Sequence, residues 1–332
     1  MSVSTTAWVV TVLVLLGLLV LDFLVTRNPH DVSLREAGAW SVFYIAAALA
    51  FGGWVLWSAG GDFATQFVAA YLVEKSLSVD NLFVFAIILA QFAVPSRLHQ
   101  RVLLAGIVFA LVMRAGFIAL GAAALHAFSF TFVIFGAVLI WTGVQLARHR
   151  DEDPEPADNA LVRLVRRRLP FTESYDEARI TTQIDGKRVV TPMLLVMIAI
   201  GSTDLLFALD SIPATFGVTS EPFLVFAANA FALLGLRALY FLLKGLLDRM
   251  IYLSLGLAAI LMFIGVKLVL TFAHDVNESW PKIPTSLSLA VILGILAVAG
   301  VASWVATQRN PDARAHAGRL TDRDQHESAE AH

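Results

Sequence analysis

The sequence predicts an all-α integral membrane protein, a polytopic helix bundle of about nine transmembrane helices with inverted three-helix repeats. The first observation is composition. The chain of 332 residues is 58% hydrophobic and only 15% charged, where soluble proteins carry about 25% charged residues. The second is a series of apolar runs of about 20 residues, the length that crosses a bilayer. The third is a pair of matched acidic signatures inside these runs.

The apolar runs divide the chain into nine expected spans. They cover roughly 7–25, 37–58, 64–92, 102–126, 127–147, 191–216, 223–245, 250–273 and 285–306. The expected organisation is a pair of N-terminal helices (1–63), a first three-helix repeat (64–147), a cytoplasmic loop (148–190), a second three-helix repeat (191–273), a last helix (274–306) and a disordered cytoplasmic tail (307–332). In the loop, an Asp-Gly pair at 185–186 between two short segments predicts a β-hairpin.

The distribution of Lys and Arg predicts the orientation of the bundle. Nearly all of them fall in the loops after the first, third, fifth and seventh spans and in the tail, whereas the opposite side holds only Lys282. The positive-inside rule therefore places the N-terminus outside and the C-terminus in the cytoplasm. We expect a multi-pass protein of the inner (plasma) membrane.

Charge and cysteine content exclude several classes of function. The formal net charge of −2 argues against a nucleic-acid partner. The chain has no cysteine, which excludes disulfides, thiolate metal sites and cysteine redox chemistry by the chain itself. No ATP-binding P-loop and no intramembrane-protease signature occurs, so we expect no enzyme, and an ion gradient would have to drive any transport.

The two acidic signatures lie in the third and sixth spans. Each has an acid, an aspartate six residues later and then a small polar residue: Glu74, Asp80 and Asn81 in one, Asp204, Asp210 and Ser211 in the other. A charged side chain at the bilayer centre costs at least about 3 kcal/mol, so these acids should line a cavity or the bundle interior. Oxygen-only ligands suit hard divalent cations such as Mn²⁺, Mg²⁺ and Ca²⁺.

The third to fifth and the sixth to eighth spans also share other features. Arg114 in the fourth span matches Arg237 in the seventh, and segment 139–146 matches 261–268. Because each unit has an odd number of spans, the two units must cross the membrane in opposite directions. Inverted repeats of this kind give alternating access around a site at the membrane midplane.

Helix geometry limits how the acids can gather. Positions six apart on a helix differ by about 120°, so Glu74 and Asp80 do not share a narrow stripe. Bringing all four acids together would require a broken helix in each repeat, and Pro213 would break the second by freeing the Leu209 carbonyl.

Buried bases leave a structural alternative open. We expect Lys75, Arg114 and Arg237 to form charge pairs between helices, and all the acids could be structural partners of this kind instead of metal ligands. Lys267, near the outer end of its span, is expected to snorkel to the interface. Asp22, near the inner end of the first span, is expected to be interfacial.

Four segments resemble the TerC/Alx family of integral membrane proteins, whose members include tellurium-resistance TerC-like and manganese-exporter Alx-like proteins. They are 74–81, 191–192, 204–214 and 229–243, within a resemblance that runs from about 64 to 272. The resemblance implies a membrane protein linked to Mn²⁺ efflux and metal homeostasis. By matched position it implies that the ion-pathway acids are Glu74, Asp80, Asp204 and Asp210, with Asn81 and Ser211 beside them.

These observations together predict a secondary transporter that exports Mn²⁺ in exchange for protons. We expect no permanently bound cofactor; the partners would be the lipid bilayer, the divalent ion and protons. The alternative is a non-transporting membrane scaffold of a tellurite and metal stress-resistance complex, which would recruit cytoplasmic stress-resistance proteins through the 148–190 loop.

Overall fold

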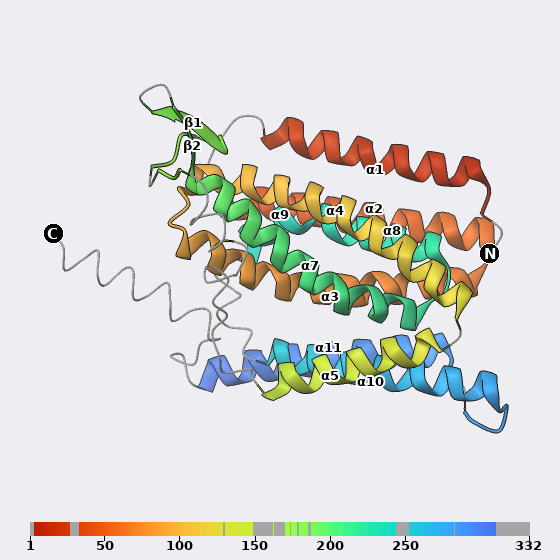
Figure 1. The fold of residues 1–332 in the computed structure, drawn as a ribbon. Helices are drawn as coiled ribbons and strands as arrows, with labels where there is room; N and C mark the ends of the chain where they lie inside the picture. Colours follow the sequence, from red (N-terminus) through yellow and green to blue (C-terminus); the bar gives the residue numbers. More distant parts are fainter. Residues whose placement is uncertain are drawn as a thin grey trace.

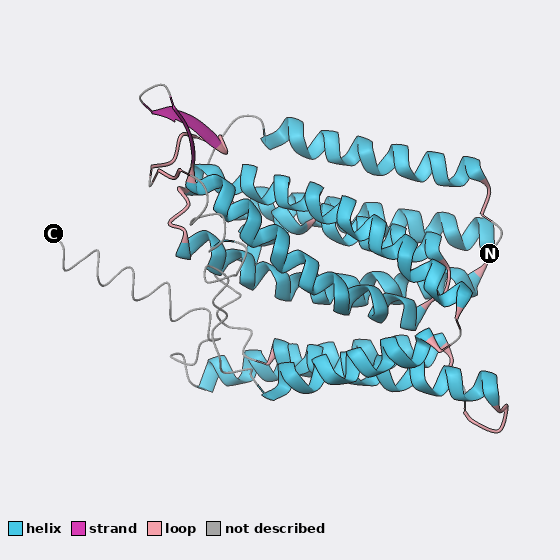
Figure 2. Cartoon of the chain, in the orientation of Figure 1, coloured by secondary structure: helices cyan, strands magenta, loops and turns pink. Residues whose placement is uncertain are grey.

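A computed structural model confirms the all-α membrane bundle (Figures 1 and 2). It describes residues 3–26, 33–128, 130–148, 162, 170–172, 174–177, 179–184, 187–243, 252–281 and 283–309. The helices are α1 (Thr5–Thr26), α2 (Leu34–Ala59), α3 (Gly61–Gln91), α4 (Ser96–Ala127), α5 (Thr131–Arg148), α7 (Pro192–Val218), α8 (Pro222–Leu234), α9 (Leu236–Leu243), α10 (Leu253–Val276) and α11 (Thr285–Arg309). They lie alongside one another in Figure 1.

Eight spans in the described part of the chain are long and apolar enough to cross a membrane, with α8 and α9 together forming one of them. The ninth expected span is α3, which has 31 residues and carries Asp62, Glu74, Lys75 and Asp80. It lies among the other helices in Figure 1. The helix with the most charges is therefore placed where protein, and not lipid, surrounds much of it.

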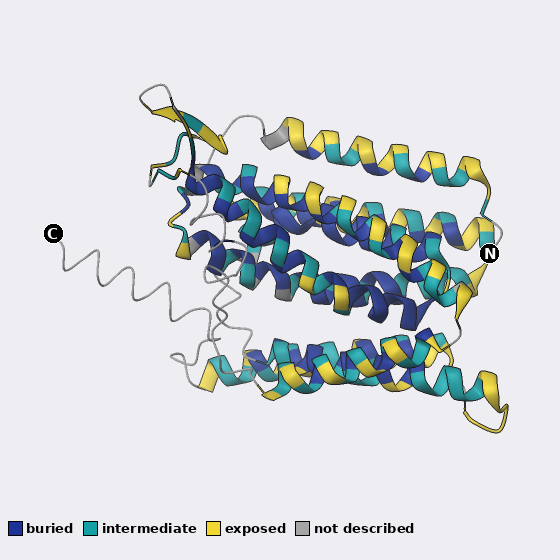
Figure 3. Cartoon of the chain, in the orientation of Figure 1, coloured by how far each residue is buried: buried dark blue, intermediate teal, exposed yellow. Residues whose placement is uncertain are grey.

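Burial separates peripheral from central helices (Figure 3). α1 exposes apolar side chains such as Val10, Leu13 and Phe23 along its length, and α11 does so at Val298 and Trp304. In contrast, α8 is almost entirely buried. Exposed apolar surface on the peripheral helices is what a hydrocarbon solvent requires.

The backbones of α5 and α10, the third helices of the two expected repeats, pack closely against each other. A Cβ on Gly136 would lie 2.7 Å from the Gly265 carbonyl oxygen, and a Cβ on Gly143 would lie 2.9 Å from the Ala258 carbonyl oxygen. When Gly143 is aligned with Gly265, as in the matched segments, Gly136 aligns with Ala258. Exchanging the two repeats therefore converts the Gly136–Gly265 contact into the Gly143–Ala258 contact. An inverted repeat requires this equivalence, and the repeat itself stays a prediction.

The expected helix break at Pro213 is wrong. α7 continues through Pro213 to Val218, because buried packing on both sides tolerates the missing hydrogen bond. The interruption lies instead at Gly235, between α8 and α9. There Lys75 Nζ donates to the Ala232 carbonyl at 3.1 Å, and a Cβ on Gly235 would lie 3.0 Å from this ammonium group.

The β-hairpin is confirmed as an antiparallel pair of β1 (Thr181–Ile184) and β2 (Lys187–Val190), which lies at the same end of the bundle as the end of α11 (Figure 1). The Tyr175 hydroxyl fastens the loop to the bundle by donating to the Phe92 carbonyl at 2.7 Å. Burial raises the pKa of Tyr175 to about 12, so this donor stays protonated at neutral pH. The Asp185–Gly186 turn, most of the 148–190 loop and the tail from 310 to 332 lie outside the described residues.

Candidate ion site

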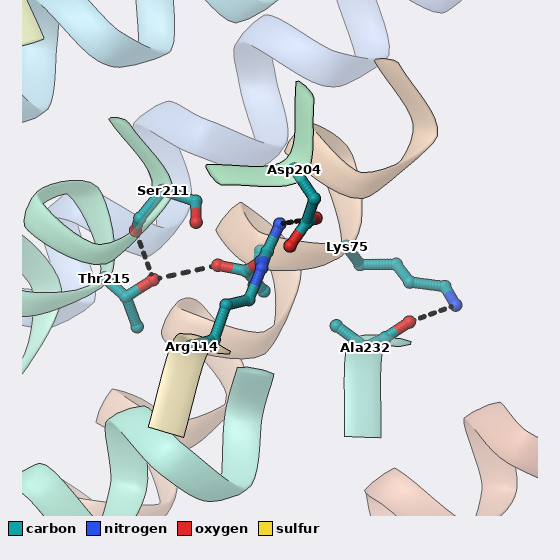
Figure 4. Close-up of polar contacts among 7 residues, drawn as sticks. Lys75, Arg114, Asp204, Ser211, Thr215 and Ala232 are labelled. Carbon is teal, nitrogen blue, oxygen red and sulfur yellow. Dashed lines mark hydrogen bonds and ion pairs between the residues drawn. The ribbon is translucent and has the colours of Figure 1, made fainter. Parts of the chain in front are cut away.

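One buried arginine joins the two acidic signatures. Arg114 of α4 is fully buried; its Nη1 bonds to Glu74 Oε1 on α3, and its Nη2 lies 3.2 Å from Asp204 Oδ1 on α7 (Figure 4). The Thr215 hydroxyl also donates to Glu74 Oε2 at 3.2 Å. The first acid of each signature is therefore engaged in an ion pair, and the same guanidinium serves both repeats.

A pocket of about 280 Å³ lies beside this network. It is lined by residues of α3, α5, α7 and α10: Leu77, Asn81, Thr142, Gln145, Leu146, Phe207, Asp210, Ser211 and Leu261. Asp210 supplies the carboxylate, and the Thr142 hydroxyl donates to its Oδ1 at 2.9 Å. Among the predicted site residues, the pocket brings together Asn81, Asp210 and Ser211. The Asp80 side chain lies outside the described part of the structure.

Asn81 and Ser211 connect the pocket to the arginine network. In the orientation that satisfies both amide atoms, Asn81 accepts from Arg114 Nη2 at 3.2 Å and donates to the Leu77 carbonyl at 3.0 Å. Ser211 lies one turn before Thr215, whose hydroxyl donates to the Ser211 carbonyl at 2.8 Å. The pocket and the ion pairs are thus neighbouring parts of one polar region.

Three residues of this region were not predicted from the sequence: Thr142, Gln145 and Thr215. The first two are polar positions three apart on one face of an otherwise apolar span. That pattern was a usable signal, but a lone threonine in a membrane helix more commonly bonds to its own backbone. Contact with Asp210 depends on the packing of α5 against α7.

The second arginine pairs outside the repeats. Arg237 of α9 holds Asp22 of α1, with its Nη2 at 2.7 Å and its Nε at 3.1 Å from Asp22 Oδ1, and the Tyr44 hydroxyl donates to the same oxygen at 2.9 Å. Asp22 is 2% exposed, so the expectation of an interfacial residue is wrong. Lys267 is also buried within the protein and does not snorkel.

The expectation of a charge pair for Lys75 is corrected as well. In the described part of the chain its ammonium contacts the Ala232 backbone carbonyl, at the helix interruption, instead of a carboxylate (Figure 4). Lys75 and Glu74 are adjacent in sequence, and a helix turns by about 100° per residue. Their side chains therefore point to different neighbours.

The side chains around Asp210 offer oxygen atoms of the kinds that hard cations prefer. No group of three or more His, Cys, Asp or Glu side chains that could hold a metal ion occurs among the residues that the structure describes. The pocket offers one carboxylate with amide and hydroxyl oxygens.

The fold and this buried polar region define a multi-pass integral membrane protein with a polar site inside its helix bundle. The chain belongs to the integral membrane protein TerC family, whose sequence model matches residues 59–311. An uncharacterized membrane protein of Mycobacterium tuberculosis is 44% identical over 334 residues, covering 96% of this chain and 84% of its own.

Two further relatives extend the similarity to other bacteria. An uncharacterized membrane protein of Myxococcus xanthus is 40% identical over 94% of this chain and 96% of its own length. The "Putative membrane-bound redox modulator Alx" of Escherichia coli is 38% identical over 84% of this chain and 88% of its own. No solved structure matches this chain.

Proposed function

We propose that this protein is a secondary transporter that exports a divalent metal ion, Mn²⁺ above all, in exchange for protons. One observation carries the proposal: the Asp210 pocket lies between helices of both halves of the chain, α3 and α5 from one and α7 and α10 from the other. A site between inverted repeats is the place where alternating access acts.

The chemistry of the pocket supports a hard cation. Its polar lining is carboxylate, amide and hydroxyl, and these ligands suit Mn²⁺ better than copper or zinc, which draw Cys and His. Tellurite is an anion and fits an acid-lined site poorly, so a link to tellurite would run through metal balance. A redox role through thiols is excluded for this chain because it has no cysteine.

Metal uptake into inverted membrane vesicles tests the proposal. A Mn²⁺-sensitive dye inside the vesicles should report uptake driven by an inside-acid pH gradient, and Asp210→Asn should reduce the rate at least about tenfold because the pocket loses its charge. Asp80→Asn is expected to act likewise. Asp275→Asn, at the exposed end of α10, is the matched control and should transport normally. Equal signals from wild type, Asp210→Asn and empty vesicles would reject transport.

A scaffold remains the second candidate because two apolar side chains are exposed at the hairpin. Ile180 and Ile184, beside and within β1, are 49% and 44% exposed. Exposed apolar residues on a cytoplasmic hairpin suit a protein partner. For a scaffold, Ile180→Ser with Ile184→Ser should abolish metal resistance in cells while Asp210→Asn preserves it. For a transporter, the two results should be reversed.

A further inference from the structure

Three buried polar residues, one each on α4, α7 and α8, form a polar layer between two apolar clusters. On each of three helices, a polar residue has one apolar residue four positions before it and another four positions after it. Residues four positions apart lie on the same face of a helix, so each polar residue shares a helix face with its two apolar neighbours. The three stripes are Ala110–Arg114–Ile118 on α4, Ile200–Asp204–Ala208 on α7 and Val225–Asn229–Leu233 on α8.

The flanking apolar residues place the three polar residues between the same two apolar clusters. Ile118, Ala208 and Val225 belong to one apolar cluster. Ala110, Ile200 and Leu233 belong to another. Asn229 therefore lies in the same layer as Arg114 and Asp204, between the same two apolar clusters.

Several atoms of this layer have no hydrogen-bond partner among the described residues. Asn229 is 1% exposed, and neither its Oδ1 nor its Nδ2 is bonded. The same is true of Asp204 Oδ2 and of Arg114 Nε. Folded proteins rarely leave buried polar atoms unpaired because the lost hydration is not replaced. The unpaired atoms indicate that a polar ligand binds among them.

The excess of negative charge in the layer favours a cation as this ligand. With the Arg114 guanidinium between them, Glu74 and Asp204 leave a net charge of −1 in the layer, and without it their two negative charges would match one divalent ion. Arg114 Nη2 also contacts Asn81, which lines the Asp210 pocket. Because Arg114 Nη2 already bonds to Asn81 at the edge of that pocket, a movement of the guanidinium toward the pocket would vacate the space between the two carboxylates.

We propose that this layer is a second, inner station for the divalent cation, with Asn229 as a ligand and Arg114 as a tethered competitor. The inference rests on the proposed transport function. An ion entering from the Asp210 pocket takes the place of the guanidinium between Glu74 and Asp204, and the return of Arg114 expels the ion. The competitor keeps a buried, strongly charged site from trapping its cargo.

Asn229→Leu tests the ligand, with purified full-length protein, MnCl₂ and reconstituted vesicles. Leucine has a similar shape and replaces an amide that has no partner, so the thermal midpoint should stay the same or rise. Mn²⁺ should still bind in the Asp210 pocket, whereas transport should fall at least about tenfold. Ser41→Ala removes a buried hydroxyl on α2 that also has no partner among the described residues, and it should leave transport unchanged. Transport by Asn229→Leu at the wild-type rate would overturn the proposal.

Arg114→Gln tests the competitor. Removing a unit charge within a few ångströms of the two carboxylates should lower the Mn²⁺ dissociation constant at least about tenfold and stop turnover. A folded Arg114→Gln protein with wild-type Mn²⁺ affinity would contradict this role. If the Arg114→Gln protein does not fold, the transport rate of Asn229→Leu tests the inner station. Wild type that neither binds nor transports Mn²⁺ would reject the proposed function itself, whereas wild-type behaviour of both variants would reject only the inner station.

Discussion

At the scale of single residues, Thr142 is a hydrogen-bond partner of the Asp210 carboxylate in the pocket. Its hydroxyl donates to Asp210 Oδ1 from a neighbouring helix. Thr142→Val keeps the shape and removes this donor. Partners that orient a metal-binding carboxylate are commonly worth about tenfold or more in affinity, so half-saturation of transport should require about ten times more Mn²⁺.

The measurement for Thr142→Val is the Mn²⁺ concentration dependence of vesicle uptake. Thr271→Val is its matched control, because Thr271 donates to the Lys267 carbonyl of its own helix and does not line the pocket. An unchanged half-saturation concentration in Thr142→Val would show that the threonine does not orient the acid.

Asp22 makes a separate prediction about stability. It is the buried carboxylate partner of Arg237, and removing one member of a buried ion pair costs about 3–5 kcal/mol because the other charge remains uncompensated. Asp22→Asn should therefore lower the thermal midpoint of the purified protein sharply. Asp22→Asn with Arg237→Gln should recover much of the loss. A single variant as stable as wild type would contradict the pairing.

At the scale of helices, the α5–α10 contact depends on glycine. A Cβ on Gly265 would lie 2.7 Å from the Gly136 carbonyl oxygen, a separation that side chains do not reach without moving the backbone. Gly265→Ala should push the helices apart and lower stability by about 1–3 kcal/mol. Thermal unfolding of the purified protein in detergent measures the change.

Gly294→Ala supplies the control for this prediction. Gly294 lies in α11 with nothing within 4 Å of an added Cβ, and alanine in a helix is favoured over glycine by about 0.5–1 kcal/mol. Gly294→Ala should therefore be neutral or stabilising. If Gly265→Ala behaved in the same way, the close contact would not limit the packing of α5 on α10.

At the scale of the whole molecule, the bundle has a testable orientation. Since the chain has no native cysteine, single cysteines can report the side on which each position lies. The start of α1 and the segment between α10 and α11 lie at one end of the bundle, and the hairpin lies at the other (Figure 1). Ser4, Glu278 and Gln183, one in each of these three segments, are exposed.

Membrane-impermeant thiol reagents applied to intact cells provide the measurement. Ser4→Cys and Glu278→Cys should react from outside, whereas Gln183→Cys should react only after the membrane is opened. Equal labelling of Gln183→Cys and Glu278→Cys in intact cells would contradict the orientation inferred from Lys and Arg.

The sequence alone determined the class of protein, the apolar spans, the hairpin and three of the polar residues that line the pocket. These features follow from local properties: the length and composition of apolar runs, the Asp-Gly pair, and the cost of charge in a membrane. Asp210 was singled out for that last reason, and Asn81 and Ser211 because each directly follows the second acid of its signature. The break assigned to Pro213 failed because proline chemistry alone does not show how a buried helix is supported by its neighbours.

Only the tertiary structure decided which charges meet. Arg114 and Arg237 occupy matching places in the sequence, yet the first joins Glu74 to Asp204 and the second holds Asp22. Partner choice depends on which helix faces cross and at what level, and hydropathy carries no information about that. The polar layer through Asn229 depends on the same crossings, because its level is defined by apolar clusters contributed by several helices.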